Sequence, residues 1–118
     1  MADARGTFEA LREAVGKRDS NALAALLAED VELVQYDQRN PPSSPLTLKG
    51  REEVERLLED IYSRDLSHEI GDEVVGDRRF SYNEYCRYPD GNRVLASWTI
   101  EAPDGVIRKA VVQQTWDE

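Results

Sequence analysis

The chain has 118 residues, 15 of them Lys or Arg and 24 Asp or Glu, and a formal net charge of −9 at pH 7. That length fits one domain, and a single cysteine excludes an intrachain disulfide. Nucleic acid and anionic membranes need a basic surface, so neither is an expected partner. No apolar run approaches the ~20 residues of a membrane span, and the N-terminal segment lacks an apolar signal core. We therefore expect a cytoplasmic protein.

The N-terminal segment predicts a short tail followed by a helix. Residues 1–6 are small or polar and are expected to be a flexible tail, so the single domain covers residues 7–118. Thr7 is a plausible N-cap for the first helix. Apolar residues then recur at helical spacing, at Phe8, Leu11 and Val15.

Helical and strand patterns alternate over the next fifty residues. A short helix is expected over residues 21–27, and apolar alternation predicts a strand over residues 31–36. The Pro-rich segment 41–45 cannot be a helix or an inner strand, so it is a loop. Residues 46–48 can form a short edge strand. The clearest helix covers residues 51–64, with an apolar stripe on one side and acidic residues on the other.

The C-terminal half predicts four long strands. They are expected over residues 66–75, 78–88, 93–102 and 106–116. Pro-Asp-Gly sequences after the second and third strands indicate hairpin turns. Helices followed by such strands predict an α+β fold, in which a strongly twisted, mostly antiparallel sheet has helices covering one face.

The order of these segments resembles the nuclear transport factor 2-like superfamily, and within it the SnoaL-like branch of polyketide cyclases and ketosteroid isomerases. The segments that carry the resemblance are ALLAEDVELV, LKGREEVERLLEDIY and SHEIGDEVVGD, in that order. The resemblance covers residues 7–117 and implies a cone-shaped α+β barrel, a curved sheet wrapped around three helices. It also implies an internal pocket for a small hydrophobic molecule and a homodimer formed through the outer sheet face.

The resemblance also places the catalytic positions of the isomerases on this chain. Their aspartate base falls at Gln35, whose amide cannot take a proton, and Asp37 is the nearest substitute. Their late-strand acid falls near Trp98 or Ile100, both apolar here. The hydrolases of the superfamily need an Asp-Arg-Asp set, of which Asp37 and Arg108 supply only two members.

Asp37 and His68 are therefore the candidate proton carriers. Asp37 could act as a general base if apolar walls raised its pKa, and the alternative is that it caps a turn. His68, the only histidine, could be an acid/base group at the pocket mouth or a side chain satisfied by one hydrogen bond. One histidine without ordered carboxylate spacing predicts no metal site, and no cofactor is expected.

The remaining candidates are binding residues. Tyr36, Tyr62 and Trp98 could line the pocket for a flat ligand, or pack in the core. Glu84 is either a charge among inward-facing aromatics or lies on a strand whose other face lines the cavity. One of two adjacent glutamines should point inward, and Gln113 is taken as that residue. Cys86 is expected to be a small buried hydrophobe.

Two functions remain open from the sequence. The first is a cofactor-free isomerase, cyclase or hydrolase that works by acid/base chemistry on a hydrophobic organic molecule. The second is a non-catalytic ligand-binding or dimeric interaction domain, which the amide at Gln35 favours.

Overall fold

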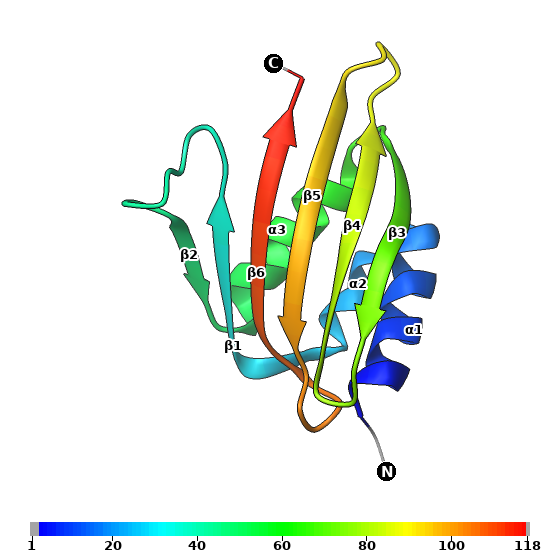
Figure 1. Ribbon diagram of the computed structural model, residues 1–118, viewed down its shortest axis with the longest axis vertical. Helices are drawn as coiled ribbons and strands as arrows, with labels where there is room; N and C mark the ends of the chain where they lie inside the picture. The colour runs from blue at the N-terminus through cyan, green and yellow to red at the C-terminus, as the bar shows by residue number, and fades with distance from the viewer. Residues whose placement is uncertain (1–2, 118) are drawn as a thin grey trace.

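The computed structural model describes residues 3–117 as an α+β fold of three helices and one six-stranded sheet (Figure 1). The sheet order is β2-β1-β6-β5-β4-β3, and the elements in chain order are α1 (Ala4–Gly16), α2 (Ser20–Ala24), β1 (Leu27–Tyr36), β2 (Leu46–Lys49), α3 (Arg51–Ser63), β3 (Ser67–Val75), β4 (Arg79–Arg87), β5 (Arg93–Glu101) and β6 (Ile107–Trp116). The predicted α+β class, the long helix, the edge strand and the four long strands are thus confirmed.

The first helix begins four residues earlier than predicted. Asp3 is its N-cap and accepts a hydrogen bond from the Arg5 amide, and Ala4 is fully buried. Thr7 lies inside the helix, where its hydroxyl donates to the Gly105 carbonyl oxygen at 2.7 Å. The expected tail therefore does not extend to residue 6, because residues 4–6 belong to the helix; its first two residues, Met1 and Ala2, lie outside the described residues.

The second helix is shorter than predicted and the first strand is longer. α2 ends at Ala24, and β1 already starts at Leu27. The Ile107 amide donates to the Leu26 carbonyl oxygen at 2.8 Å, and Leu27 is paired with Ile107. The last strand therefore draws this segment into the sheet, a long-range contact that local helical spacing does not reveal.

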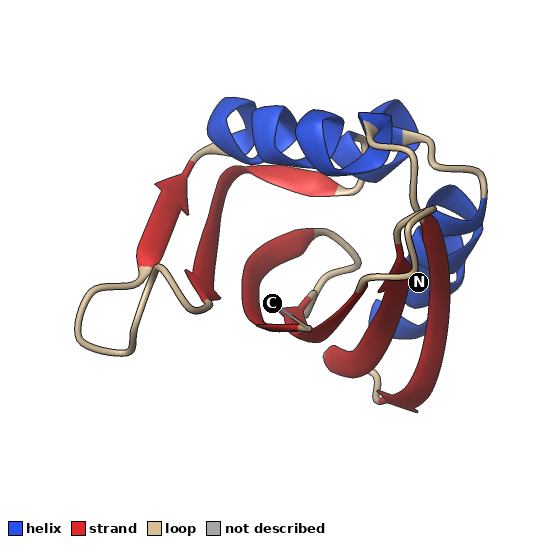
Figure 2. Cartoon of the chain, turned by 90° about the horizontal axis from the view of Figure 1, so that it is seen from above, coloured by secondary structure: helices blue, strands red, loops and turns tan. Residues whose placement is uncertain are grey.

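The sheet is strongly curved, as the resemblance implied, and it is open rather than closed into a barrel. β3 to β6 form an antiparallel meander, β2 pairs antiparallel with β1, and β1 runs parallel to β6. All three helices lie on one side of the sheet, behind it in Figure 1. Figure 2 shows the sheet curling beneath α3, which leaves a concave face turned toward the helix.

The core fills the space between α1 and the half of the sheet that contains β3 and β4. Phe8 packs edge-on against Phe80 with 5.2 Å between ring centroids, and it lies 6.0 Å from the Tyr82 ring. Along β4 the alternation of buried and exposed residues puts Phe80, Tyr82, Glu84 and Cys86 on this inner face. The inner face is thus apolar at one end and carries a charged residue nearer the other.

The long helix α3 covers the rest of the concave face. Gly50 precedes it with a φ of 92°, a left-handed conformation that favours glycine, and its amide donates to the Val31 carbonyl oxygen at 2.8 Å. Val54, Leu58 and Tyr62 form its buried stripe. Tyr62 lies in the last turn, so its side chain reaches the same end of the sheet as Glu84. Within residues 3–117, none of the helices is long and apolar enough to span a membrane.

Candidate functional site

A cleft of about 570 Å³ lies between the C-terminal part of α3 and the concave face of the sheet. Aliphatic and aromatic side chains form much of its wall, namely Leu57, Ile61, Leu66, Val94, Ala96, Trp98 and Trp116. Polar side chains that are buried or partly buried lie among them: Gln35, Asp37, His68, Glu84, Cys86 and Gln114. Charged and polar residues of the loops and of the end of α3 complete the lining, among them Arg39, Asp60, Arg64, Asp90, Arg93 and Asp117.

Glu84 is the centre of a buried polar cluster in this cleft. The residue is 2% exposed, yet its carboxylate accepts two hydrogen bonds from neutral donors. The Tyr62 hydroxyl donates to Oε2 at 2.8 Å, and the Trp98 indole N–H donates to Oε1 at 3.0 Å. Trp98 is thus both a cleft-lining aromatic, as predicted, and a positioning partner of the carboxylate. Tyr62 does not line the cleft itself, and its contribution is the hydrogen bond that it donates to Glu84.

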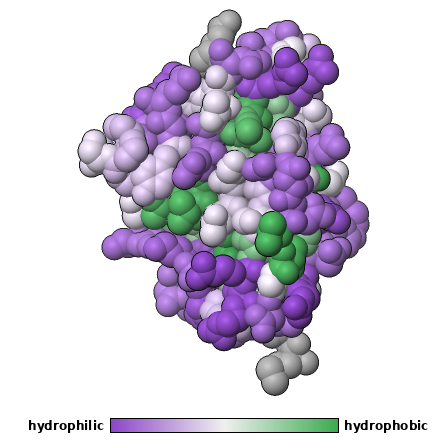
Figure 3. Space-filling view, in the orientation of Figure 1, coloured by the Kyte–Doolittle hydropathy of each residue, from purple (hydrophilic) through white to green (hydrophobic). Residues whose placement is uncertain are grey.

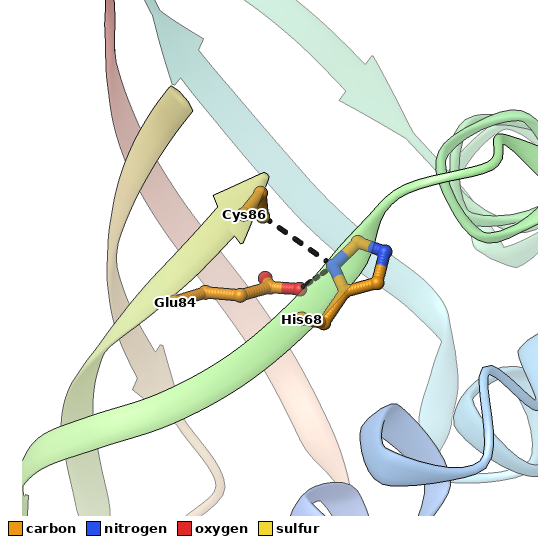
Figure 4. Close-up of side chains that lie close together, drawn as sticks. All are labelled: His68, Glu84 and Cys86. Carbon is orange, nitrogen blue, oxygen red and sulfur yellow. Dashed lines mark hydrogen bonds and ion pairs between the residues drawn. The ribbon is translucent and has the colours of Figure 1, made fainter. Parts of the chain in front are cut away.

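His68 completes the cluster from the neighbouring strand. Its Nδ1 lies 2.7 Å from Glu84 Oε2 and 3.4 Å from Cys86 Sγ (Figure 4). The register explains this convergence, because His68 on β3 is paired directly with Cys86 on β4, and Glu84 is the diagonal neighbour on the same face. The His68 ring also packs against the Tyr62 ring, with 4.7 Å between centroids.

The hydrogen-bond roles in the cluster follow from the donors available. Tyr62 and Trp98 both donate to Glu84, which fits an ionised carboxylate, since that group only accepts. We therefore assign a hydrogen to His68 Nδ1, from which it is donated to Glu84 Oε2. The other ring nitrogen, Nε2, is covered by protein atoms and has no hydrogen-bond partner within residues 3–117. As an unprotonated nitrogen it leaves only a lone pair unsatisfied.

Burial makes the neighbouring acidic groups hard to ionise. Burial, followed by the charge of Glu84, raises the pKa of Tyr62 well above its ordinary value. The same two causes in the same order raise the pKa of Cys86 to about 12. Both groups are therefore neutral at pH 7, and Cys86 carries a thiol of low nucleophilicity unless its proton is displaced.

Asp37 lines the cleft, but its carboxylate is occupied by a turn. Oδ1 accepts from the amides of Arg39 and Asn40 at 2.8 and 2.9 Å, and Oδ2 accepts from Gln35 Nε2 at 2.8 Å. Burial raises the pKa of this carboxyl, but the hydrogen bonds from Gln35, Arg39 and Asn40 outweigh it and hold the pKa below its ordinary value. The geometry thus matches the turn-capping alternative rather than a base with a raised pKa.

Gln35 points into the cleft, at the place where the resemblance puts an isomerase base. It is 8% exposed, and its Nε2 is used by Asp37. Its Oε1 is buried and has no partner in the described part of the chain. This oxygen is an acceptor for which a ligand could supply a donor.

Besides Tyr62, two of the predicted binding residues lie outside the cleft. Tyr36 and Gln113 are neighbours in the parallel register of β1 and β6 and lie on the outer face of the sheet. Gln114 lines the cleft instead, because it is paired with Ala96, which is buried on the inner face. The choice of Gln113 was therefore wrong by one residue, which in a strand reverses the face.

Sequence reasoning missed two contributors to the site. Cys86 was expected to be an inert buried residue, yet it adjoins His68 Nδ1 at 3.4 Å. Trp116 lines the cleft near the end of the chain, with the Arg39 guanidinium 5.9 Å from its ring centroid. Side chains alternate between the two faces along β4 and β6, so both residues could have been assigned to the cleft. That assignment requires one inward-facing residue of each strand to be known first.

A scan against protein families matches residues 8–115 to the SnoaL-like domain. The chain belongs to the SnoaL-like family. No curated protein matches it closely enough in sequence to add to this assignment. The family match confirms the resemblance drawn from the order of helices and strands.

Solved structures similar to this SnoaL-like chain share its fold at low sequence identity. An NTF2-like protein of unknown function from Mesorhizobium loti is 19% identical, with a TM-score of 0.82 over 94% of this chain and 89% of that one. The "putative ketosteroid isomerase" of Kribbella flavida DSM 17836 is 21% identical, with a TM-score of 0.75 over 97% and 77%. A protein from Sphaerobacter thermophilus is 17% identical, with a TM-score of 0.75 over 99% and 100%. At these identities the similarity establishes the fold alone.

Proposed function

We propose that this protein binds a small, largely apolar organic molecule in the cleft, and that His68 and Glu84 transfer a proton to or from it. The observation that carries the proposal is a buried carboxylate–imidazole pair, 2.7 Å apart, in a cleft whose wall includes the apolar side chains of Leu66, Ala96 and Trp98. Pockets for organic ligands combine such walls with a few placed polar groups. A cleft of about 570 Å³ also falls in the size range of such pockets.

Glu84 and His68 would divide the work as orienting group and base. Glu84 holds Nδ1–H, which fixes the tautomer and leaves the lone pair on Nε2 free to accept a proton. Transfer requires that the ring become accessible, because Nε2 is now covered. Leu66 and Ile61 line the same cleft, and a shift of such side chains on ligand binding would open the ring.

The reaction class that suits this arrangement is proton abstraction beside a carbonyl group. The neutral imidazole would take the proton, and Gln35 Oε1 would accept a hydrogen bond from a hydroxyl group elsewhere on the ligand. The fold similarity to the Kribbella flavida protein adds support, since that protein is named as a ketosteroid isomerase and a ketosteroid contains a carbonyl group.

Deuterium exchange tests the proposal without knowledge of the product. The protein is incubated in D₂O with steroid and aromatic cyclic ketones that raise its melting temperature, and incorporation of deuterium beside the carbonyl is measured by mass spectrometry. The wild type should accelerate exchange, and His68→Gln should remove the acceleration. Asp37→Asn is the matched control and should keep it, because that carboxylate caps a turn. Exchange that is lost in Asp37→Asn and kept in His68→Gln would overturn the assignment.

A second candidate function is binding without catalysis. It is favoured by the amide at Gln35 and by the occupied carboxylate of Asp37, which together leave the usual base position without a base. Ketones that bind tightly in the cleft but show no exchange above that of free solution would support this function over the first.

We also propose that the outer face of the sheet forms a homodimer. This face carries exposed apolar side chains, including Tyr85 at 45% and Val74 at 70% exposure. Figure 3 shows hydrophobic patches in the middle of the sheet face opposite the helices, surrounded by hydrophilic residues. Light scattering at micromolar concentration should give twice the chain mass of 13.4 kDa, and a monomer mass would contradict the proposal.

A further inference from the structure

We propose that His68, Glu84 and Cys86 form a zinc site in the wall of the cleft. The three side chains offer a nitrogen, a carboxylate oxygen and a sulfur that all lie within 4.8 Å of one another. Nothing in their spacing along the chain indicates this set, because the pairing of β3 with β4 brings it together. A mixed nitrogen, oxygen and sulfur set suits Zn²⁺, whereas Mg²⁺ and Ca²⁺ prefer oxygen alone.

The separations of the donor atoms are close to those around a tetrahedral ion. Bonds of about 2.0 Å to nitrogen and oxygen and about 2.3 Å to sulfur place nitrogen and sulfur about 3.5 Å apart, and nitrogen and oxygen about 3.3 Å apart. The observed Nδ1–Sγ distance is 3.4 Å, which already fits. The observed Nδ1–Oε2 distance is 2.7 Å, so the carboxylate and the ring would separate by about 0.6 Å.

The arrangement of hydrogens around Nδ1 also suits a metal ion. Both Glu84 Oε2 and Cys86 Sγ approach the same nitrogen, although a single N–H cannot be donated well to both. A zinc ion would replace that shared hydrogen and satisfy all three atoms at once. The hydrogen on Nδ1 moves to Nε2, and the Cys86 proton leaves to solvent, so binding releases one proton. A zinc-bound His68 therefore cannot act as the base of the proposed function, and zinc should inhibit deuterium exchange. The thiolate and the carboxylate then neutralise the double charge of the ion.

The surroundings of the site predict its strength and its open position. Tyr62 and Trp98 donate to the Glu84 carboxylate and so hold it in place, as outer partners of metal ligands do. His68 Nε2 has no acceptor in the described part of the chain, which should weaken the site about 10- to 100-fold relative to one with a partnered histidine. Three protein ligands leave a fourth position. Because all three residues line the cleft, water or a ligand carbonyl oxygen would fill it.

Titration with Co²⁺ tests the site directly. Cobalt bound to a thiolate gives an intense near-ultraviolet charge-transfer band, and tetrahedral cobalt absorbs in the visible. The chain has one cysteine and one histidine, so a thiolate band from the folded protein can come only from Cys86. We expect one equivalent to bind with both bands, and Zn²⁺ to displace it. Cys86→Ser should lose the near-ultraviolet band and bind at least 100-fold more weakly, and Asp37→Asn should bind as the wild type does.

The proposal is overturned if folded wild type shows no thiolate band at millimolar Co²⁺, or if Cys86→Ser binds Co²⁺ as tightly as the wild type. Circular dichroism of each variant separates loss of ligand from loss of fold. Ketone binding is measured in parallel with EDTA present. Ketone binding without a cobalt band would reject the zinc site and leave the proposed binding function intact. A cobalt band without ketone binding would support the zinc site and reject the proposed binding function.

Discussion

The Tyr62→Phe substitution probes the buried cluster with the least disturbance of packing. It removes one hydroxyl, which donates to Glu84 Oε2 at 2.8 Å, and leaves the ring in place. Both residues are buried, at 6% and 2% exposure, so solvent cannot replace the lost donor. A hydrogen bond to a charged group contributes about 1.5–3 kcal/mol to stability. We therefore expect the free energy of unfolding to fall by about that amount, with a melting temperature roughly 5–10 °C lower.

Urea denaturation followed by tryptophan fluorescence measures this effect, because Trp98 adjoins the same carboxylate. The matched control is Tyr88→Phe, which removes a hydroxyl that accepts from Arg64 at 3.2 Å on the surface. That control should change stability by no more than about 0.5 kcal/mol. Combining Tyr62→Phe with Glu84→Gln should show a coupling of about 1 kcal/mol or more. A loss below about 0.5 kcal/mol in Tyr62→Phe, with no coupling, would refute a charged Glu84 held by this bond.

Three further results follow from the buried groups and the strand register. Burial raises the pKa of Tyr62 and of Tyr82 well above the value of about 10 that they have when unfolded, and it raises the pKa of Cys86 from 9.0 to about 12, so the free energy of unfolding should be level up to about pH 8 and fall as the pH rises above 9; urea titrations from pH 7 to 11 check this, and an unchanged midpoint at pH 11 would contradict it. The pKa of Cys86 is raised from 9.0 to about 12, so at pH 8 the native thiol should react with iodoacetamide about a thousandfold more slowly than the unfolded thiol, and equal rates would show an exposed cysteine. Gln114→Ala should weaken binding of any cleft ligand several-fold while Gln113→Ala leaves it unchanged, because only Gln114 lines the cleft; calorimetry that ranks the two in the opposite order would reverse the assigned face.

Much of the fold could be predicted because its strongest signals are local. The apolar stripe of α3, the Pro-rich break and the two Pro-Asp-Gly turns each depend on neighbours in the chain. The errors arose where distant segments decide the structure. The start of β1 depends on its pairing with Ile107, and the start of α1 depends on Asp3 rather than on Thr7, whose hydroxyl bonds to the distant Gly105 carbonyl oxygen.

The site was predicted less completely, since each residue had to be assigned to a face. Glu84, Trp98, His68 and Gln35 could be named as candidates from their chemistry, and all four line the cleft. Their mutual contacts depend on register, which the sequence leaves open until one inward-facing residue of each strand is fixed. A shift of one residue explains the error at Gln113, and the contact between Cys86 and His68 was invisible for the same reason.

The His68–Glu84 pair is proposed as the reactive part of the cleft. Long-range proton–nitrogen NMR of the single histidine tests this role, because it reports which ring nitrogen carries the hydrogen and whether a ligand perturbs it. In metal-free protein we predict a hydrogen on Nδ1, donated to Glu84, and nitrogen shifts that move when a cyclic ketone binds. A hydrogen on Nε2 alone, or ring signals unchanged by a ketone that saturates the protein, would contradict this role.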